Sequence, residues 1–153
     1  MTATPPLDLP NDAVDAHANA LLERNLKALA IRNPDLAERL ATVTAGDVTW
    51  FTAADGVLSA LYATQTLASR HAPKEEAEQI ANRVDLREKA VAVVLGFGLG
   101  HHVAALATRV LRSGLIVVLE PDFALLRAVF ERIDHSAWLT NANVFFFDGA
   151  EEL

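Results

Sequence analysis

The segment AVAVVLGFGLGHHVAALATRVLRSGLIVVLEPD, residues 90–122, predicts how this chain folds. Its first six residues are continuously apolar, as expected of a parallel strand buried on both faces. A glycine loop follows at residues 96–100, and residues 101–112 then show apolar side chains at helical spacing. A second apolar run, residues 115–119, ends in Glu120-Pro121-Asp122. The segment therefore predicts two parallel strands joined by a crossover helix.

The flanking sequence on the C-terminal side continues the same alternation. Residues 123–133 predict a second helix, and residues 144–147 predict a third short strand after a turn at Asp134-His135-Ser136. This order of elements is typical of a Rossmann-like α/β domain.

The sequence before residue 90 predicts smaller elements. A helix should begin near Asn11 or Asp12 and bury its apolar stripe, which comprises Val14, Ala18, Leu21, Leu22, Leu26 and Leu29. Asn33 can cap a second, short helix that starts with Pro34 and runs through Leu40. Asp55-Gly56 is a hairpin turn signal between residues 48–52 and 57–62, although the second run could also form a helix. Residues 74–84 predict a charged surface helix.

We therefore predict an α/β fold in which a Rossmann-like parallel sheet is preceded by an N-terminal helical pair and a small β-hairpin. The expected division is a loose leader at residues 1–11, a helical and hairpin part at 12–89, and the Rossmann-like unit at 90–153. A doubly wound sheet rarely stops after three strands, because its outer edge would stay open. We expect this unit to be truncated at its C-terminal end, with a longer polypeptide or another chain covering the edge.

Composition limits the classes of function. The chain has 153 residues, 52% of them hydrophobic, a net charge of −7 and no cysteine. An acidic balance argues against a nucleic-acid partner, and the absence of cysteine excludes disulfides and thiolate zinc sites. The longest apolar run, residues 90–99, is shorter than the roughly 20 residues that cross a bilayer. With no signal-peptide pattern, we expect a cytoplasmic protein without nucleic-acid or membrane partners.

The glycine loop is the candidate binding site. Glycine permits a sharp turn from strand to helix and lets a phosphate or carboxylate approach the backbone at the helix N-terminus. Glu120 lies 24 positions after Gly96, close to the separation of about 20 at which a carboxylate meets a ribose. The candidate ligand-binding residues are Gly96, Gly98, Gly100, His101, Glu120 and Asp122.

Two interpretations of this loop remain open. The spacing G-x-G-x-G places His101 where a dinucleotide fold has its third glycine, and is closer to the first motif of S-adenosylmethionine-dependent methyltransferases. That motif usually has an acid two positions before its first glycine, where this chain has Val94. The ligand would then be a nucleotide or S-adenosylmethionine; alternatively, the loop is a crossover that binds nothing. No set of residues has recognisable catalytic or metal-ligand spacing.

Three parts of the chain carry a resemblance to a known family. The segment TLASRHAPKEEAE, residues 66–78, is similar to the L-H-S-x-Y-D-P-x-x-E-A segment of the motility accessory factor family, the flagellin glycosyltransferases that transfer nonulosonic acids. The segments GFGLGHH and LEPD resemble that family's G-F-G-L-G-Y-H and I-E-P-D. The opening ERNLKAL with NPDL is also similar. The chain departs from the family at Ala68 and at His71-Ala72.

The resemblance implies an N-terminal accessory domain whose catalytic domain lies downstream in the same polypeptide. In such proteins the central domain binds the sugar nucleotide and performs the transfer. The partners implied are that downstream domain and flagellin; the open sheet edge allows a second copy of the chain as a further partner. The alternative from the residues themselves is a nucleotide- or S-adenosylmethionine-binding Rossmann module of methyltransferase type.

Overall fold

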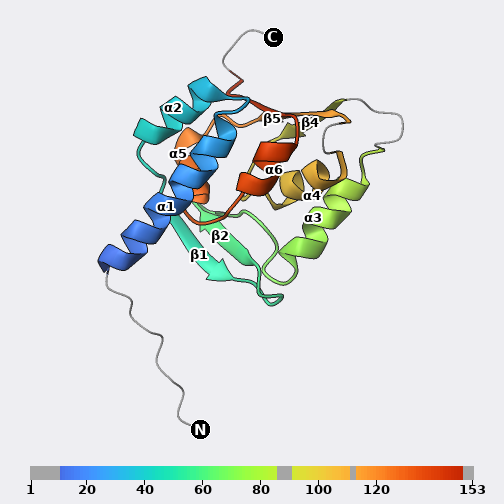
Figure 1. The fold of residues 1–153 in the computed structure, drawn as a ribbon. Helices are drawn as coiled ribbons and strands as arrows, with labels where there is room; N and C mark the ends of the chain where they lie inside the picture. Colours follow the sequence, from blue (N-terminus) through green and yellow to red (C-terminus); the bar gives the residue numbers. More distant parts are fainter. Residues whose placement is uncertain (1–10, 86–90, 111–112, 150–153) are drawn as a thin grey trace.

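The computed structural model describes residues 11–85, 91–110 and 113–149, and it has the α/β fold that the sequence predicts. A three-stranded parallel sheet and a three-stranded antiparallel sheet are packed together with helices (Figure 1). Almost all of the expected leader, residues 1–10, lies outside the described residues.

The N-terminal helical pair is confirmed as α1 (Asn11–Leu29) and α2 (Pro34–Thr42). Pro34 occupies the first turn of α2, where its missing N–H costs nothing. The first part of α1 extends beyond the body of the molecule (Figure 1). Val14, predicted to face inward, is therefore 46% exposed. The stripe is buried only further along the helix, at Leu21, Leu22 and Leu29.

The hairpin is also confirmed. β1 (Val48–Thr52) pairs antiparallel with β2 (Leu58–Tyr62), so residues 57–62 do not form the helix that their composition also allowed. A two-residue strand that was not predicted, β3 (Gln65–Thr66), adds to β2. Helix α3 (Pro73–Asn82) then follows and packs beside α4 (His101–Val110), the crossover helix of the parallel sheet.

The three predicted parallel strands are β4 (Val91–Leu95), β5 (Leu115–Leu119) and β6 (Val144–Phe147), in the spatial order β4-β5-β6. Two helices lie between β5 and β6 in the chain, α5 (Phe123–Phe130) and α6 (Ser136–Asn141). The sequence predicted a single helix at residues 123–133 and a turn after it. It therefore extended α5 by three residues and missed α6.

The two faces of the parallel sheet differ in burial. On one face Ala92, Ile116 and Val144 form a buried row, and the next row comprises buried Val118 and Phe146 with half-buried Val94. The opposite face carries Val91, Val93, Leu95, Leu115, Val117, Leu119, Phe145 and Phe147, none of them fully buried. The expectation that the first strand is buried on both faces is therefore wrong for β4, where Val93 is 61% and Leu95 79% exposed.

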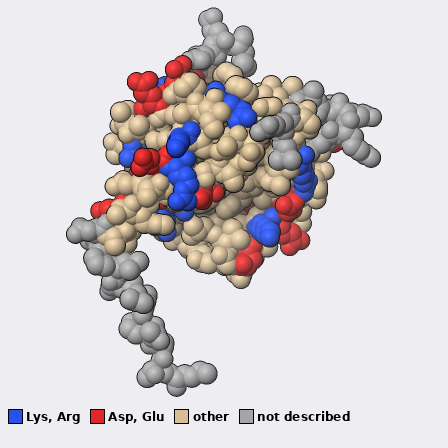
Figure 2. Space-filling model, in the orientation of Figure 1, with Lys and Arg blue, Asp and Glu red and all other residues tan. Residues whose placement is uncertain are grey.

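One hydrophobic core connects the expected N-terminal part and the expected Rossmann-like unit. Leu29 and Leu40 from the helical pair and Ala60 from the hairpin belong to the same cluster as Val118 and Phe130. On the face drawn in Figure 2, acidic and basic side chains are interspersed. Within the described ranges, no helix has the length and apolar character needed to span a membrane.

Candidate functional site

The glycine loop follows β4 and adopts a backbone that only glycine accepts readily. Gly96, Gly98 and Gly100 all have positive φ, at 86°, 53° and 81°. The Gly96 N–H donates to the Leu119 carbonyl at 2.8 Å, and the Gly100 N–H donates to the Phe97 carbonyl at 2.8 Å. The loop therefore closes on itself and remains attached to β5 before α4 begins.

Phe97 and Leu99 turn the loop toward the core, with exposed fractions of 1% and 2%. The Phe97 ring contacts an aromatic cluster that comprises Phe130, His135, Trp138 and Phe146. A Cβ on Gly100 would lie 2.3 Å from the Phe97 ring and 2.8 Å from Cε1 of His135. Gly100 is thus required for packing as well as for its backbone angle.

Glu120 is buried beside the loop and is fully engaged with backbone. Its Oε2 accepts the Phe97 N–H at 2.7 Å, and its Oε1 accepts the Asp122 N–H at 3.0 Å. Its own N–H donates to the Phe147 carbonyl at 2.9 Å. The carboxylate therefore ties the end of β5 to the loop after β4, and any ligand hydroxyl would share an oxygen that already accepts a backbone N–H.

Asp122 connects the sheet to the hairpin. Its Oδ1 accepts the Leu125 N–H at 3.0 Å and so caps α5, while its Oδ2 accepts the Tyr62 hydroxyl at 2.7 Å. This hydrogen bond is the main cause that raises the pKa of Tyr62, because it stabilises the protonated phenol. Asp122 thus joins β2 to the carboxyl end of the parallel sheet.

The two histidines at the start of α4 point to different partners. Nε2 of His101 lies 2.8 Å from the Leu58 carbonyl oxygen, which joins α4 to β2. Nε2 of His102 lies 3.1 Å from the Gly96 carbonyl oxygen. Burial lowers the pKa of His102, because the charged imidazolium loses solvation. Both rings thus hydrogen-bond to backbone around the loop.

His135 is the important residue of this region that sequence reasoning missed. It is 2% exposed, with Nε2 2.9 Å from the Leu99 carbonyl oxygen and Nδ1 accepting the Trp138 indole N–H at 3.0 Å. These partners fit a neutral ring that is protonated on Nε2, and burial lowers its pKa to about 4. Its neighbours Asp134 and Ser136 are typical turn residues, and no local pattern marks this histidine as buried.

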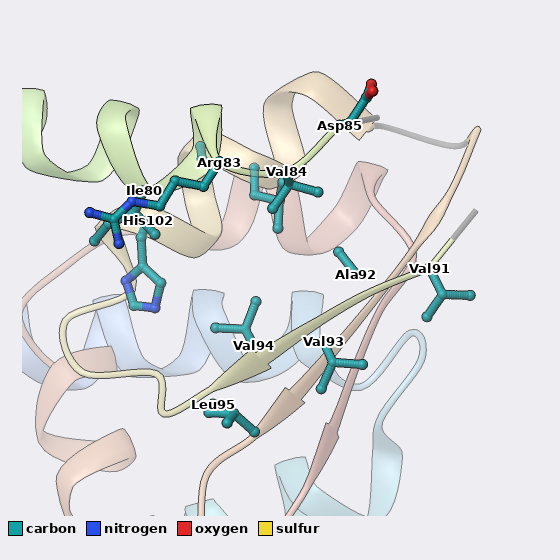
Figure 3. A pocket seen from close by; sticks show the side chains of 12 residues that line it. Ile80, Arg83, Val84, Asp85, Val91, Ala92, Val93, Val94, Leu95 and His102 are labelled. Carbon is teal, nitrogen blue, oxygen red and sulfur yellow. The ribbon is translucent and has the colours of Figure 1, made fainter. Parts of the chain in front are cut away.

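The structure brings five of the six predicted site residues around one loop. Gly96, Gly98, Gly100 and His101 form the turn and the helix start, and Glu120 reaches the loop from the end of β5. Asp122 lies next to Glu120, but its side chain is directed to the N-terminus of α5 and to Tyr62. Two cavities adjoin this region. One of about 120 Å³ is lined by Leu99, His101 and His102, and on the other side by α3 and the segment that leads into it. The other, of about 610 Å³, runs along β4 beneath α3 and includes His102 (Figure 3).

The segment at residues 66–78 is folded onto the hairpin turn. The Asp55 N–H donates to the His71 carbonyl at 3.0 Å, and the Ser69 hydroxyl oxygen accepts the N–H groups of His71 and Ala72, each at 3.1 Å. The Glu76 carboxylate in turn accepts the Ser69 N–H. These contacts position α3 beside α4, and among the described residues no group of three or more His, Asp or Glu side chains could hold a metal ion.

Fold and site together define a Rossmann-like α/β domain built on a strand–glycine loop–helix crossover. Its fold is similar to part of the MAf glycosyltransferase from Magnetospirillum magneticum AMB-1, with a TM-score of 0.59 and 20% identity. That likeness covers 84% of this chain and 27% of the glycosyltransferase chain, so the present chain spans about a quarter of that protein.

A second structure with a match is that of MNMC2 from Aquifex aeolicus, at 15% identity over 90% of this chain and 56% of that one. Its TM-score of 0.39 is too low to support an argument. No protein-family model matches the sequence, and no curated protein matches it either.

Proposed function

We propose that this chain is the N-terminal accessory domain of a motility-associated glycosyltransferase that transfers nonulosonic acid to flagellin. The observation that carries the proposal is the fold likeness to one part of a longer glycosyltransferase, over 84% of this chain. The motifs GFGLGHH and LEPD support it, because they meet at one loop through the Glu120–Phe97 hydrogen bond. We propose that the protein acts in the cytoplasm.

The transfer chemistry belongs to the downstream domain in this proposal. Among the described residues, the polar side chains around the loop are engaged in structural hydrogen bonds: Glu120 with two backbone N–H groups, Asp122 with a cap and Tyr62. A general base must reach the proton that it abstracts within about 3 Å, and these groups are held by the fold. The accessory domain would contribute contacts to flagellin or to assembly, including pairing with a second copy.

An activity assay with a cytidine-activated nonulosonic acid and flagellin tests this division of labour. The 153-residue chain alone should transfer no sugar, whereas the polypeptide translated past Leu153 should do so. Sugar transfer by the short chain would contradict the proposal, and so would an inactive long polypeptide that binds neither substrate.

The second candidate function is a module that binds a nucleotide or S-adenosylmethionine, and the positive φ of Gly96, Gly98 and Gly100 favours it. The loop leads directly into α4, whose N-terminus favours anionic groups. Calorimetric titration of the 153-residue chain with cytidine nucleotides and with S-adenosylmethionine tests this alternative: saturable binding of either one below about 100 μM supports the module. Glu120→Ala is a poor probe here, because it also removes two hydrogen bonds of the loop.

A further inference from the structure

Among the described residues, no strand pairs with the outer edge of β4. Gly96, directly after β4, donates its N–H to Leu119 of β5. In a parallel ladder alternate residues turn toward the same neighbour, so the N–H and C=O groups of Val93 and Leu95 point to the outer edge. An edge of this kind is a template for pairing.

A groove lies alongside this edge. It has a volume of about 610 Å³ and lies between β4 and α3, with Ala92 and Val94 pointing toward α3 and α4 (Figure 3). The lining is mostly apolar and includes Ile80 and Val84 from the α3 side and Leu106 from α4. Helix α3 thus overhangs the position that a strand beside β4 would occupy.

The opposite edge of the sheet is blocked. The Asn33 side chain donates to the Val144 carbonyl at 2.9 Å and accepts the Phe146 N–H at 3.0 Å. One amide therefore takes up the Val144 carbonyl and the Phe146 N–H, which a further strand beside β6 would otherwise bind. Among the described residues, β4 is thus the edge at which the sheet can more readily be extended.

The chain's own topology specifies what would cover both the edge and the open face. Strand-crossover-strand connections in one parallel sheet are right-handed in about 98% of cases. The crossovers from β4 to β5 and from β5 to β6 both move along the sheet from β4 toward β6, and their helices cover the same face of the sheet. A crossover from β6 to the free side of β4 moves along the sheet in the opposite direction. If it is also right-handed, its helix must cover the opposite face.

We propose that the groove along β4 receives a strand parallel to β4, and that the exposed sheet face receives its crossover helix, both from the polypeptide that follows β6. The inference rests on the proposed function, in which a downstream domain continues the chain. It accounts for the exposure of Val91, Val93, Leu95 and Phe147 together. The matched region is only 27% of the MAf glycosyltransferase chain, so that protein has ample polypeptide for such a segment.

Hydrogen exchange at single amides tests the proposal. It compares the 153-residue chain with the polypeptide translated past Leu153. The Val93 and Leu95 amides should exchange rapidly in the short chain and at least about 100-fold more slowly in the long one, because the added strand accepts them. The Val94 amide, which faces β5, should be protected in both. Equal exchange of Val93 and Leu95 in the two proteins would overturn the proposal.

A matched pair of variants gives a second readout. Val93→Lys places a charge on the exposed face of the sheet. Ile31→Lys is the control: it also replaces an exposed apolar side chain with a charged one, at a residue that is 58% exposed and lies outside the groove and the sheet. Only Val93→Lys should remove the protection at Leu95 in the long polypeptide, and neither should unfold the short chain. If the two variants behave alike in the long polypeptide, the inference fails.

The remaining outcomes separate this inference from the proposed function. Protection of Val93 and Leu95 in a short chain that dimerises would identify a second copy as the occupant and overturn the proposal. A coding sequence that ends at Leu153 would also overturn it. Sugar transfer by a long polypeptide with unprotected Val93 would reject this inference alone. Protection without sugar transfer would instead reject the proposed function.

Discussion

At the scale of single residues, substitutions of Gly96 and Gly100 distinguish the cost of a left-handed backbone from the cost of steric crowding. Their φ angles are nearly equal, at 86° and 81°, but a Cβ on Gly96 meets nothing within 4 Å whereas one on Gly100 meets Phe97 and His135. We expect Gly96→Ala to lower the free energy of unfolding by about 1–2 kcal/mol, the cost of a left-handed L-residue. Gly100→Ala should cost about 1–3 kcal/mol more, because the aromatic cluster must shift.

Urea unfolding of both variants measures this difference. Gly56→Ala is a further control, since Gly56 has φ of 87° and open space around it in the hairpin turn. It should behave like Gly96→Ala. Equal destabilisation by Gly96→Ala and Gly100→Ala would show that the loop is not packed against Phe97 as described.

The buried His135 makes stability depend on pH. Its pKa is about 4 in the folded chain and about 6.5 when unfolded, so between these values the unfolded chain binds a proton that the folded chain does not. Stability from this residue is therefore fully present above pH 6.5. It decreases as the pH falls toward 4, by up to about 1.4 kcal/mol per pH unit and roughly 3 kcal/mol in total.

Urea unfolding between pH 4.5 and pH 7 checks this slope. His135→Gln is the informative variant, because its amide can donate to the Leu99 carbonyl and accept from Trp138 without titrating. It should flatten the pH dependence, whereas His71→Gln, at an exposed histidine, should leave it unchanged. A slope that is the same in all three proteins would contradict the assignment.

The sequence pointed to six candidate site residues, but it did not predict the hydrogen-bond partners of their side chains. Glycine spacing and an acid at the end of the next strand are local signals, and they correctly placed Glu120 at the loop. That Glu120 accepts two backbone N–H groups, and that His135 lies against Leu99, depends on how distant segments pack. Whether the six residues bind a ligand stays a prediction.

At the scale of elements, Asn33 connects the turn between α1 and α2 to the outer edge of β6. Its amide bonds the Val144 carbonyl and the Phe146 N–H, two backbone groups that a neighbouring strand could otherwise bind. Asn33→Ala leaves both backbone groups without their partner, so we expect a loss of about 1–3 kcal/mol. It should also increase self-association, because an unblocked edge can pair with other chains. Urea unfolding and light scattering measure the two effects.

Asn141→Ala is the matched control for this prediction. Asn141 is exposed, and within the described part of the chain its amide donates to the Ala137 carbonyl one turn earlier, so its loss should change stability little. If Asn33→Ala is as mild as Asn141→Ala and the chain stays monomeric, Asn33 does not protect the β6 edge.

The sequence predicted helix positions well where the helical periodicity was long, and strand positions well where a run of residues was purely apolar. The strands at residues 115–119 and 144–147 begin and end as predicted. Asn33 precedes α2 as expected, but makes no side-chain cap, because its amide is used on β6. Helix α6 was missed because it has only six residues, too few for a periodic signal, and it follows a strong turn sequence.

At the scale of the whole molecule, the proposed downstream strand and helix would explain why β4 is apolar on both faces although it lies at an edge of the sheet. A sequence that is apolar on both faces predicts a central strand, and the structure places that strand at an edge with one face exposed. The sequence could predict the type of strand from its side chains, but not which neighbours would be present. Strand order depends on long-range pairing, which local patterns do not encode.

The Asn33 contact also affects the order of events during synthesis. Its partner Phe146 is 113 residues further along the chain, and the Arg32 side chain reaches Leu139 in the same region. The turn between the first two helices can therefore make these contacts only after the ribosome has released β6. Contacts of such high sequence separation slow folding, since loop closure must precede them. While β6 is still in the exit tunnel, the emerged apolar strands lack this neighbour, and exposed apolar surface of this kind favours aggregation.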